Sequence, residues 1–357
     1  MELKQNCRYG IVVPTSMGIR LTPAGQQPTY ASDLFSMQAT SAESNVATIC
    51  ASLGVPVKAL TTLIKDDPIS LFIRNDLARR GIEVEARETV KEGPWGVRHQ
   101  INFSDTGFGS RGPRVSSDRA GEVGRELSAG DFDLERLFAA EGVQILHMSG
   151  LISAISENTA RLCLDLARAA KKNGTLVSFD LNYRASFWKG REEELRETFT
   201  NIALMSDILI GNEEDFQQAL GVEGPALEEG VAGNAVEQFK AMIGRAEKMF
   251  PGVRLFANTL REVVSANEHL WGALVKEAGK WHHIEPRPIR VLDRIGGGDA
   301  FVGGLLYGIL RGWGTDAAAK FGWAAGAMAV TLLTDYVMAP SEDILWDIWH
   351  GNARVKR

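Results

Sequence analysis

Short apolar runs alternate with amphipathic stretches along most of the chain. Runs rich in β-branched residues predict buried strands at 9–14, 57–64, 145–150, 175–180 and 208–210. Apolar residues at helical spacing predict helices between them, at 44–53, 67–80, 157–172, 191–204 and 236–250. A later region, 253–284, predicts successive short strands that are antiparallel where the gaps are brief. Strands that alternate with helices of this length predict an α/β fold with a mostly parallel sheet covered on both faces.

Two early regions depart from this rhythm. Residues 20–35 are polar and rich in turn formers, and residues 84–115 alternate between polar and apolar positions around a glycine-rich turn. Such alternation predicts hairpin strands instead of another βαβ unit. We therefore expect a single domain over residues 1–357, with a lid formed by segments of approximately 15–37 and 86–117.

The stretch Asp293-Arg-Ile-Gly-Gly-Gly-Asp299 precedes an apolar segment with helical spacing. Its three glycines allow backbone conformations closed to other residues and let main-chain N–H groups approach an anion. These N–H groups would lie at a helix N-terminus, where partial positive charge accumulates. Asp299 would then stand beside the anion as a base for a hydroxyl group. The alternative is an ordinary glycine turn with Asp299 as a helix cap, and the loop by itself leaves both interpretations open.

Composition and charge favour a soluble protein that acts on a small molecule. The formal charge of the 357-residue chain is −6 and its Lys and Arg residues are scattered, so no footprint for nucleic acid or an anionic membrane is present. Cys7, Cys50 and Cys163 lack CxxC spacing, which favours free thiols in a reducing compartment. No run approaches the roughly 18 apolar residues of a membrane span, so we expect a cytoplasmic location. The absence of GxxxxGK[ST] excludes a P-loop, and the absence of GxGxxG after a strand argues against a dinucleotide-binding dehydrogenase.

Three motifs together resemble those of the ribokinase-like, PfkB-type family of carbohydrate kinases. Ala42-Glu-Ser-Asn45-Val-Ala47, with Leu53-Gly54 downstream, resembles the first signature of that family. Gly211-Asn-Glu-Glu-Asp215 resembles its Asn-x-x-Glu element near magnesium and phosphates, with Asp215 in place of the glutamate, and the stretch from Asp293 to Phe301 resembles its second signature. The resemblance implies a doubly wound, mostly parallel sheet with helices on both faces and a small β-sheet lid.

Within that family the chain most resembles 2-keto-3-deoxygluconate kinases. The likeness rests on Asp118-Arg-Ala, on Asp180-Leu-Asn-Tyr-Arg184 with Trp188, on the segment from Asn258 to Ser265, and on the Arg-Ile-Gly-Gly-Gly form of the late loop. It implies that ATP and Mg²⁺ are used to phosphorylate a hydroxyl group of a sugar acid.

The resemblance also assigns roles to single residues. Asp299 would take the proton of the acceptor hydroxyl, and Gly296, Gly297 and Gly298 would stabilise charge on the transferred phosphoryl group. Arg119 and Arg184 would bind the carboxylate of the sugar acid, and Ser41 and Asn45 would contact the substrate. The remaining roles fall to Asn212, Thr259, Arg261 and Ser265 on the nucleotide side and to Asp215 at Mg²⁺ through water. Helix capping by Asn212 and surface salt bridges at the two arginines are the alternatives.

The acceptor side departs from the family pattern. Thr40-Ser41 stands where the first signature has Gly-Gly, Thr15-Ser16 where an early strand usually ends Gly-Glu, and Ser117 and Arg98 where tyrosines are expected. Such side chains shift or shrink a sugar pocket. Two alternatives to a kinase for 2-keto-3-deoxygluconate or a related acid therefore stay open: a kinase for a neutral sugar such as fructose or ribose, and a non-catalytic relative that senses sugar or nucleotide. The family likeness also implies a homodimer through the lid.

Overall fold

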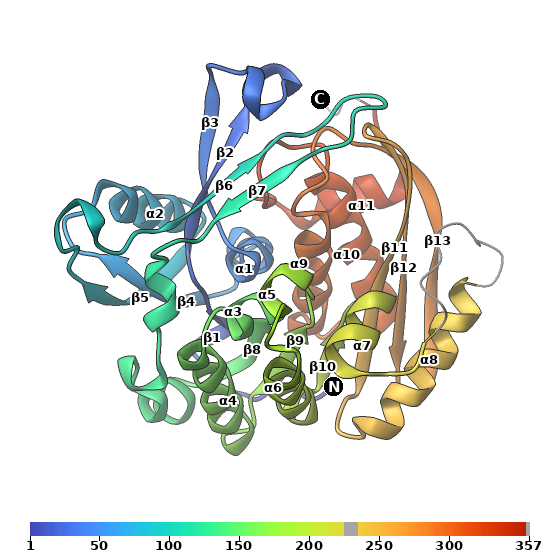
Figure 1. Ribbon diagram of the computed structural model, residues 1–357. Coiled ribbons are helices and arrows are strands. Elements are labelled where there is room, and N and C mark those ends of the chain that lie inside the picture. The colour runs from blue at the N-terminus through green and yellow to red at the C-terminus, as the bar shows by residue number, and fades with distance from the viewer. Residues whose placement is uncertain (225–234, 355–357) are drawn as a thin grey trace.

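A sheet of nine strands forms the body of the protein, and Figure 1 shows how it is arranged. The computed structural model describes residues 1–224 and 235–354, and within them the spatial order is β13-β12-β11-β10-β9-β8-β1-β4-β5. All neighbours from β11 to β5 pair in parallel, whereas β11, β12 and β13 form an antiparallel extension. The strands are β1 (Tyr9–Pro14), β4 (Val57–Ile64), β5 (Ile82–Thr89), β8 (Val143–Ser149), β9 (Leu176–Asp180), β10 (Ile208–Ile210), β11 (Leu255–Ser265), β12 (Glu268–Glu277) and β13 (Lys280–Arg290). The predicted α/β fold with a mostly parallel sheet is confirmed.

Helices cover both faces of this sheet because its central strands are apolar on both sides. Ile11 and Val13 of β1 belong to one buried core and Val12 to the other, since successive side chains of a strand point to opposite faces. The first core is closed by α1 (Ala42–Ser52), α2 (Pro68–Arg79), α9 (Gly297–Leu310), α10 (Thr315–Ala329) and α11 (Glu342–His350). The second is closed by α3 (Gly150–Ala154), α4 (Glu157–Lys172), α5 (Ala185–Trp188), α6 (Glu192–Met205), α7 (Glu213–Leu220) and α8 (Ala235–Met249).

Small residues let α9 and α10 pack closely against each other and against α1. A Cβ atom on Gly304 of α9 would lie 2.8 Å from the Cα of Gly322 in α10, and one on Gly308 would lie 2.6 Å from the Cβ of Ala318. This close contact anchors the helix that follows the glycine loop. No helix among residues 1–224 and 235–354 is both long and apolar enough to cross a membrane.

Two strand predictions were wrong. Residues 82–89 form β5, which extends the large sheet in parallel with β4, although the region reads as hairpin material. This strand lies at the sheet edge and is only partly buried, so it carries the alternating pattern typical of an exposed hairpin. The stretches around 253 and 263 are not two short strands, because residues 255–265 run as the single strand β11 against β12.

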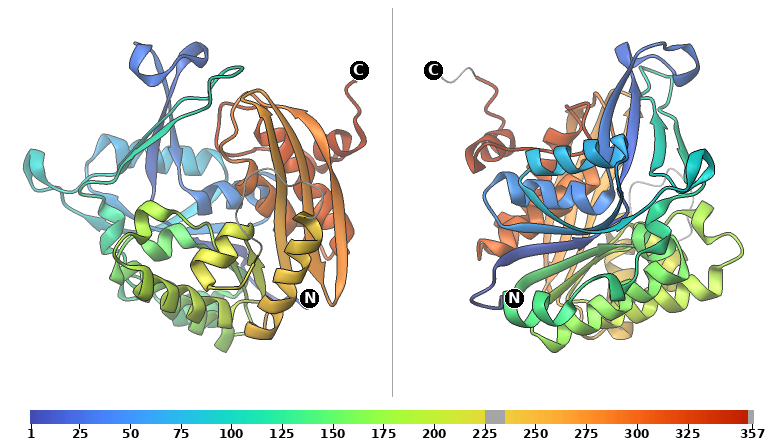
Figure 2. Two further views of the ribbon diagram at one scale, coloured as in Figure 1. Left: turned by 45° about the vertical axis from the view of Figure 1, so that its right-hand side comes forward. Right: turned by 90° about the vertical axis from the view of Figure 1, so that its left-hand side faces the viewer.

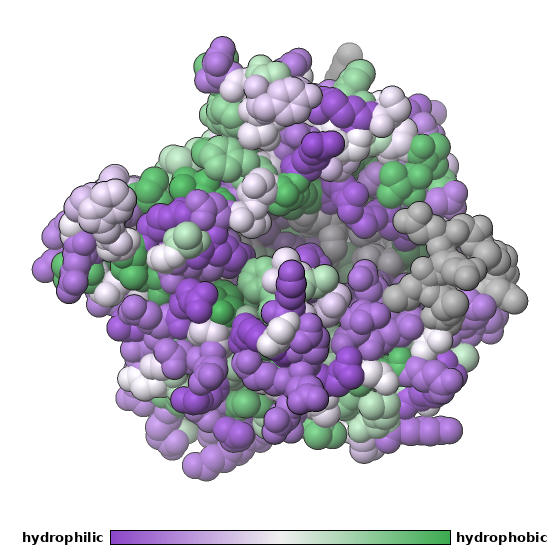
Figure 3. All heavy atoms as spheres, viewed as in Figure 1, coloured by the Kyte–Doolittle hydropathy of each residue, from purple (hydrophilic) through white to green (hydrophobic). Residues whose placement is uncertain are grey.

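A separate four-stranded sheet projects from the body (Figure 2). Its order is β3-β2-β6-β7, with β2 antiparallel to β3, parallel to β6, and β6 antiparallel to β7. The strands are β2 (Gly18–Pro23), β3 (Phe35–Thr40), β6 (Gln100–Ser104) and β7 (Val115–Asp118). The predicted hairpin is therefore present as β6 and β7. Below this small sheet the surface of the molecule is hollowed (Figure 3).

The two faces of the small sheet differ in polarity. Paired residues lie in rows across the strands, and one row consists of Gln38, Arg20, Asn102 and Ser117. The next row along the strands, on the opposite face, contains Met37, Leu21, Phe103 and Ser116. One face of the sheet is thus polar and the other is largely apolar.

Candidate active site

The glycine loop turns sharply into α9 and leaves the start of that helix open. Gly296 is the N-cap residue with φ of 82°, a left-handed conformation that favours glycine. A Cβ atom there would overlap the backbone carbonyl of Asp335. Gly298, by contrast, has nothing within 4 Å of where its Cβ would be. No side chain caps the first turn of α9, so its N–H groups can receive an anion.

Asp299 lies in the first turn of α9, beside this open end. Its Oδ2 accepts a hydrogen bond of 2.9 Å from Nδ2 of Asn45 in α1. Burial raises the pKa of Asp299 to about 7, the bond from Asn45 opposes the rise, and the negative charges of Asp335 and Glu43 add to it. A carboxyl group with a pKa near neutrality is suited to exchange a proton with a hydroxyl group at physiological pH.

The charges of two predicted site residues, Asp215 and Asp299, act on a third aspartate at the carboxyl end of a parallel strand. Asp180 ends β9, and its pKa is raised well above the ordinary value by burial and then by the charges of Asp215 and Asp299. Asp180 was not among the predicted site residues, although its place at the end of a buried parallel strand is a signal for a binding site. The three carboxyls therefore share one electrostatic environment.

Asn212 and Asp215 form a reciprocal cap on α7. The N–H of Asp215 donates to Oδ1 of Asn212 at 2.9 Å, and the N–H of Asn212 donates to Oδ2 of Asp215 at 2.8 Å. Oδ1 of Asp215 also accepts the N–H of Tyr183 at 2.9 Å. Burial nevertheless raises the pKa of Asp215 to about 6. The capping alternative for Asn212 is confirmed, and each oxygen of Asp215 keeps a lone pair for a water molecule.

Three arginines near the glycine loop have no ion pair within the described residues: Arg184, Arg261 and Arg294. Desolvation, together with the positive charges of Arg294 and Arg184, lowers the pKa of Arg261 to about 10. Burial and the charges of Arg261 and Arg294 lower the pKa of His269, on β12, to about 4. Arg294 was missed as a site residue because only the fold brings it to Arg261, which lies on β11 with Thr259 and Ser265. Unpaired positive charge at this place is suited to an anionic ligand.

The two arginines predicted to bind a carboxylate have different surroundings. Nη1 of Arg119 donates to both oxygens of Glu122, at 2.7 and 2.9 Å, and its guanidinium lies 5.1 Å from the ring centroid of Phe187. Glu122 is buried and also accepts a 2.5 Å hydrogen bond from Oγ of Ser16. Arg184 is exposed, and among the described residues its Nη1 donates only to the carbonyl of Tyr183, at 2.7 Å. The salt-bridge alternative therefore describes Arg119, with a buried partner, but not Arg184.

Most of the residues that depart from the family pattern are bonded to the protein itself. Oγ1 of Thr15 donates to Glu43 at 2.7 Å, and Oγ1 of Thr40 donates to Asp335 at 2.6 Å. Ser41 caps α1, where its Oγ accepts the N–H of Ser44 at 3.2 Å. Ser117 is exposed on β7. Both threonines stabilise a buried carboxylate by donating a hydrogen bond to it, as Ser16 does for Glu122.

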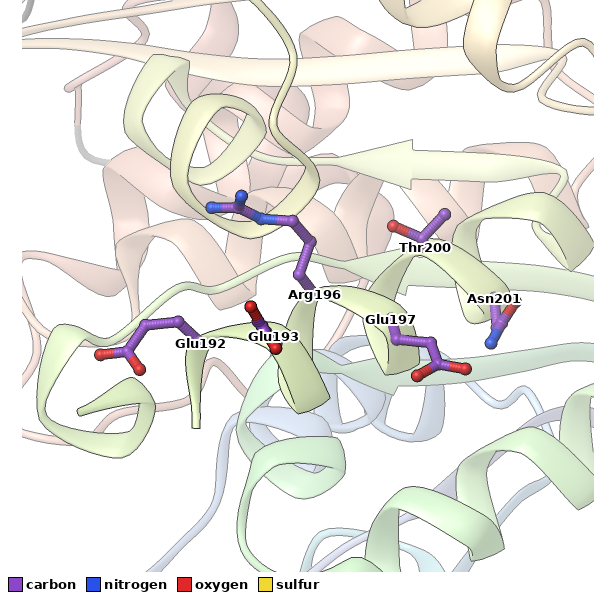
Figure 4. Close-up of a pocket in the computed structure, with 6 residues that line it drawn as sticks. All are labelled: Glu192, Glu193, Arg196, Glu197, Thr200 and Asn201. Atoms are coloured by element: carbon purple, nitrogen blue, oxygen red, sulfur yellow. The ribbon is translucent and has the colours of Figure 1, made fainter. Parts of the chain in front are cut away.

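A shallow pocket lies along α6 and is lined by Glu192, Glu193, Arg196, Glu197, Thr200 and Asn201 (Figure 4). All six side chains come from this one helix and spread along it instead of converging. None of the predicted site residues takes part in it. This pocket therefore does not coincide with the predicted site around the glycine loop.

Comparison with known proteins agrees with this geometry. Residues 34–246 and 271–341 match the model of the pfkB family of carbohydrate kinases. The chain belongs to this family. Its fold is ribokinase-like and it is a carbohydrate kinase, as its motifs predict.

Individual relatives cover nearly the whole chain. The 5-dehydro-2-deoxygluconokinase of Clostridium perfringens is 27% identical over 334 residues, which cover 92% of this chain and 89% of the relative. The crystal structure of 2-dehydro-3-deoxygluconokinase from Thermotoga maritima has a TM-score of 0.85 and 27% identity, and the match covers 97% of this chain and 100% of that one. An E. coli protein provisionally named ribokinase II, solved with ATP and Mg²⁺, shares the fold with a TM-score of 0.75 and 18% identity. The match covers 96% of this chain and 99% of that one.

Proposed function

We propose that this kinase transfers the γ-phosphoryl group of ATP to a hydroxyl group of 2-keto-3-deoxygluconate or a related sugar acid. Relatives named for deoxy-gluconic and deoxy-galactonic acids support an acidic acceptor. The observation that carries the proposal is the position of Asp299: a carboxyl group with a pKa near 7 stands at the uncapped start of α9.

The chemistry follows from that position. Asp299 takes the proton of the acceptor hydroxyl while the oxygen of that hydroxyl forms a bond to the γ-phosphorus. The bond from the γ-phosphorus to the bridging oxygen breaks at the same time and releases ADP. The N–H groups at the start of α9, behind Gly296, Gly297 and Gly298, stabilise the charge on the transferred group. Asn45 holds Asp299 in place through its 2.9 Å hydrogen bond.

Two of the unpaired arginines, Arg261 and Arg294, belong to the nucleotide side. Arg261, with Thr259 and Ser265 on the same strand, binds the phosphates of ATP, and we add Arg294 because its charge acts on Arg261 and because it forms no ion pair with the described residues. Mg²⁺, when bound here, would supply positive charge that offsets the charge of the phosphates. The lone pairs left on Asp215, with Asn212 beside it, fit an ion held mainly by water and phosphate oxygens. Among residues 1–224 and 235–354, no cluster of three metal-ligating side chains offers a protein cage instead.

The acceptor side carries the choice between sugar acids and neutral sugars. Arg184 forms no ion pair with the described residues and lies close enough to Asp299 to lower its pKa, which supports a role in holding an acceptor carboxylate near the base. Ser41 and Asn45 contact the sugar from α1. Arg119 supports the acid only through the guanidinium edge that Glu122 leaves open. Compensation of Arg119 by Glu122 is the observation that favours the neutral-sugar alternative.

The small sheet completes the site as a lid. Segments of approximately 15–37 and 86–117 contain its strands β2, β6 and β7 and the start of β3, and its polar face carries Ser117. The opposite face is partly exposed, with Phe35 at 37% and Met37 at 41%. An apolar sheet face of this kind supports a homodimer formed through the lid.

A coupled assay of ADP release with a panel of acceptors tests the proposal. Turnover is expected with sugar acids, and turnover with neutral sugars alone would contradict an acidic acceptor. Asp299→Asn is expected to lower kcat by roughly 10²–10⁴-fold while calorimetry still detects nucleotide binding. Turnover by this variant at the wild-type rate would show that Asp299 is not the base, and no turnover by the wild-type enzyme with any acceptor would support a sensing role.

A further inference from the structure

A buried ion cluster joins the small sheet to the glycine loop. Arg20 of β2 is 1% exposed, and its guanidinium pairs with Asp293 and with Asp335, which are 0% and 2% exposed. Asp293 begins the loop and also accepts the N–H of Ile295 at 3.0 Å. Asp335 belongs to the segment between α10 and α11. One cation therefore holds two buried carboxylates from separate parts of the chain.

The polar face of the small sheet supplies the rest of the cluster. Thr40 donates to Oδ2 of Asp335 at 2.6 Å, and Gln38 both donates to Oδ1 of Asp335 and accepts its N–H, at 3.3 Å each. Nη2 of Arg20 also donates to Oγ of Ser104 at 3.1 Å. The cluster is thus built by side chains from β2, β3 and β6 that share one face of the sheet.

The cluster is in direct contact with the turn of the glycine loop. The backbone of Gly296 packs so closely on the carbonyl of Asp335 that no Cβ would fit. Gly296 in turn is the N-cap of α9, three residues before Asp299. A shift of Asp293 or Asp335 would therefore move the helix start and the base together.

We propose that Arg20 is a positioning residue for phosphoryl transfer, which holds the glycine loop at a set distance from the acceptor-binding face of the small sheet. This inference rests on the proposed function, because it takes the loop as the phosphoryl cradle and that face as the acceptor side. A guanidinium group presents five N–H donors in a rigid fork, so it can fix two carboxylates at once. An ammonium group offers no such fork. Arg20 also stands in one row with Asn102 and Ser117, which ties the row across the sheet to the loop.

The alternative is that Arg20 only stabilises the fold, and a matched control separates the two roles. Lys58 is likewise buried, at 2% exposed, and pairs with Glu85 at 2.7 Å and with Glu83 at 3.3 Å. It lies near the amino end of β4, away from the glycine loop at the carboxyl ends of the strands. Arg20→Met, Arg20→Lys and Lys58→Met are compared in the full-length enzyme, well below their unfolding temperatures, with kcat, KM and the folded fraction measured for each.

Arg20→Met is expected to lower kcat about 10²-fold, with KM for ATP and acceptor changed by less than about threefold, because misplacement of the cradle weakens contacts made in the transition state. Lys58→Met is expected to lower thermal stability with kcat unchanged per folded molecule. If Arg20→Met does not fold, Arg20→Lys keeps the charge and is expected to lower kcat at least about tenfold.

A folded Arg20 variant with wild-type kcat would overturn the inference. It would also be overturned if the Arg20 and Lys58 variants lose turnover to the same extent and only in proportion to their folded fraction. Asp299→Asn is measured alongside. If turnover collapses in Asp299→Asn but survives in the Arg20 variants, only the role of Arg20 is wrong. If Asp299→Asn keeps the wild-type rate, Asp299 is not the base, and the role of the glycine loop in the proposed function fails whatever the Arg20 variants show.

Discussion

Gly296 and Gly298 are two residues apart in one loop, yet a methyl group at each is expected to have opposite effects. At Gly296 the left-handed φ of 82° disfavours any Cβ, and the carbonyl of Asp335 occupies its place. At Gly298 the backbone is helical and the space is open. Gly296→Ala should therefore damage the fold, whereas Gly298→Ala should affect only a ligand that enters the space beside α9.

The structure sets the size of each effect. A left-handed alanine costs about 1–2 kcal/mol and forcing a methyl into packed structure about 1–3 kcal/mol more, so Gly296→Ala loses about 2–5 kcal/mol of unfolding free energy. With about 2.1 cal/mol/K of unfolding entropy per residue, a chain of 357 residues loses about 3–7 °C in Tm. Gly298→Ala should leave Tm unchanged. Its methyl would stand where the phosphoryl group has to approach the N–H groups, and loss of one such contact lowers kcat/KM about 10²–10³-fold.

Differential scanning calorimetry and initial rates on the two purified variants give the comparison. We expect the Gly298→Ala enzyme to be as stable as the wild type but to have a severely reduced kcat/KM for ATP. We expect the Gly296→Ala enzyme to have a lower Tm than the wild type. A Gly298→Ala enzyme with wild-type kcat/KM would show that no phosphate approaches this part of the helix, and the cradle would have to be sought elsewhere.

Three further results are expected, two for Asp299 and one for Asp215. Because the pKa of Asp299 is raised to about 7, kcat/KM should fall as the pH drops below 7, and a rate that does not change between pH 5 and 8 would show that Asp299 is not the base. The unfolded chain loses the proton of Asp299 at a pKa of about 3.9, so above that pH the ionisation of Asp299 opposes folding. Asp299→Asn should therefore have a higher Tm than the wild type at pH 8. Asp215→Asn should raise the MgCl₂ concentration for half-maximal rate by about 10-fold or more, and an unchanged Mg²⁺ titration at fixed ATP would exclude the predicted role of Asp215 near the ion.

Much of this architecture follows from local pattern. Apolar strands and amphipathic helices place β1, β4, β8, β9 and β10 in a covered parallel sheet, because each element must bury its apolar side. The glycine loop with Asp299 could also be recognised, since left-handed turns and helix starts leave a signature over a few adjacent residues. Where burial is weak the pattern misleads, and β5 at the sheet edge therefore looked like part of a hairpin.

Long-range pairing lies beyond such patterns. Nothing adjacent to Arg20 in the sequence indicates that it meets Asp293 and Asp335, which lie 273 and 315 residues away. The same holds for Arg294, whose charge acts on Arg261, and for Ser16, which donates to Glu122. The sequence by itself determined the family, the glycine loop in front of a helix and the α/β class of the fold, because these depend on patterns among neighbours in the chain. Only the tertiary structure decided which charges are buried together, since burial and partner set the pKa and the free lone pairs of every charged group in the site.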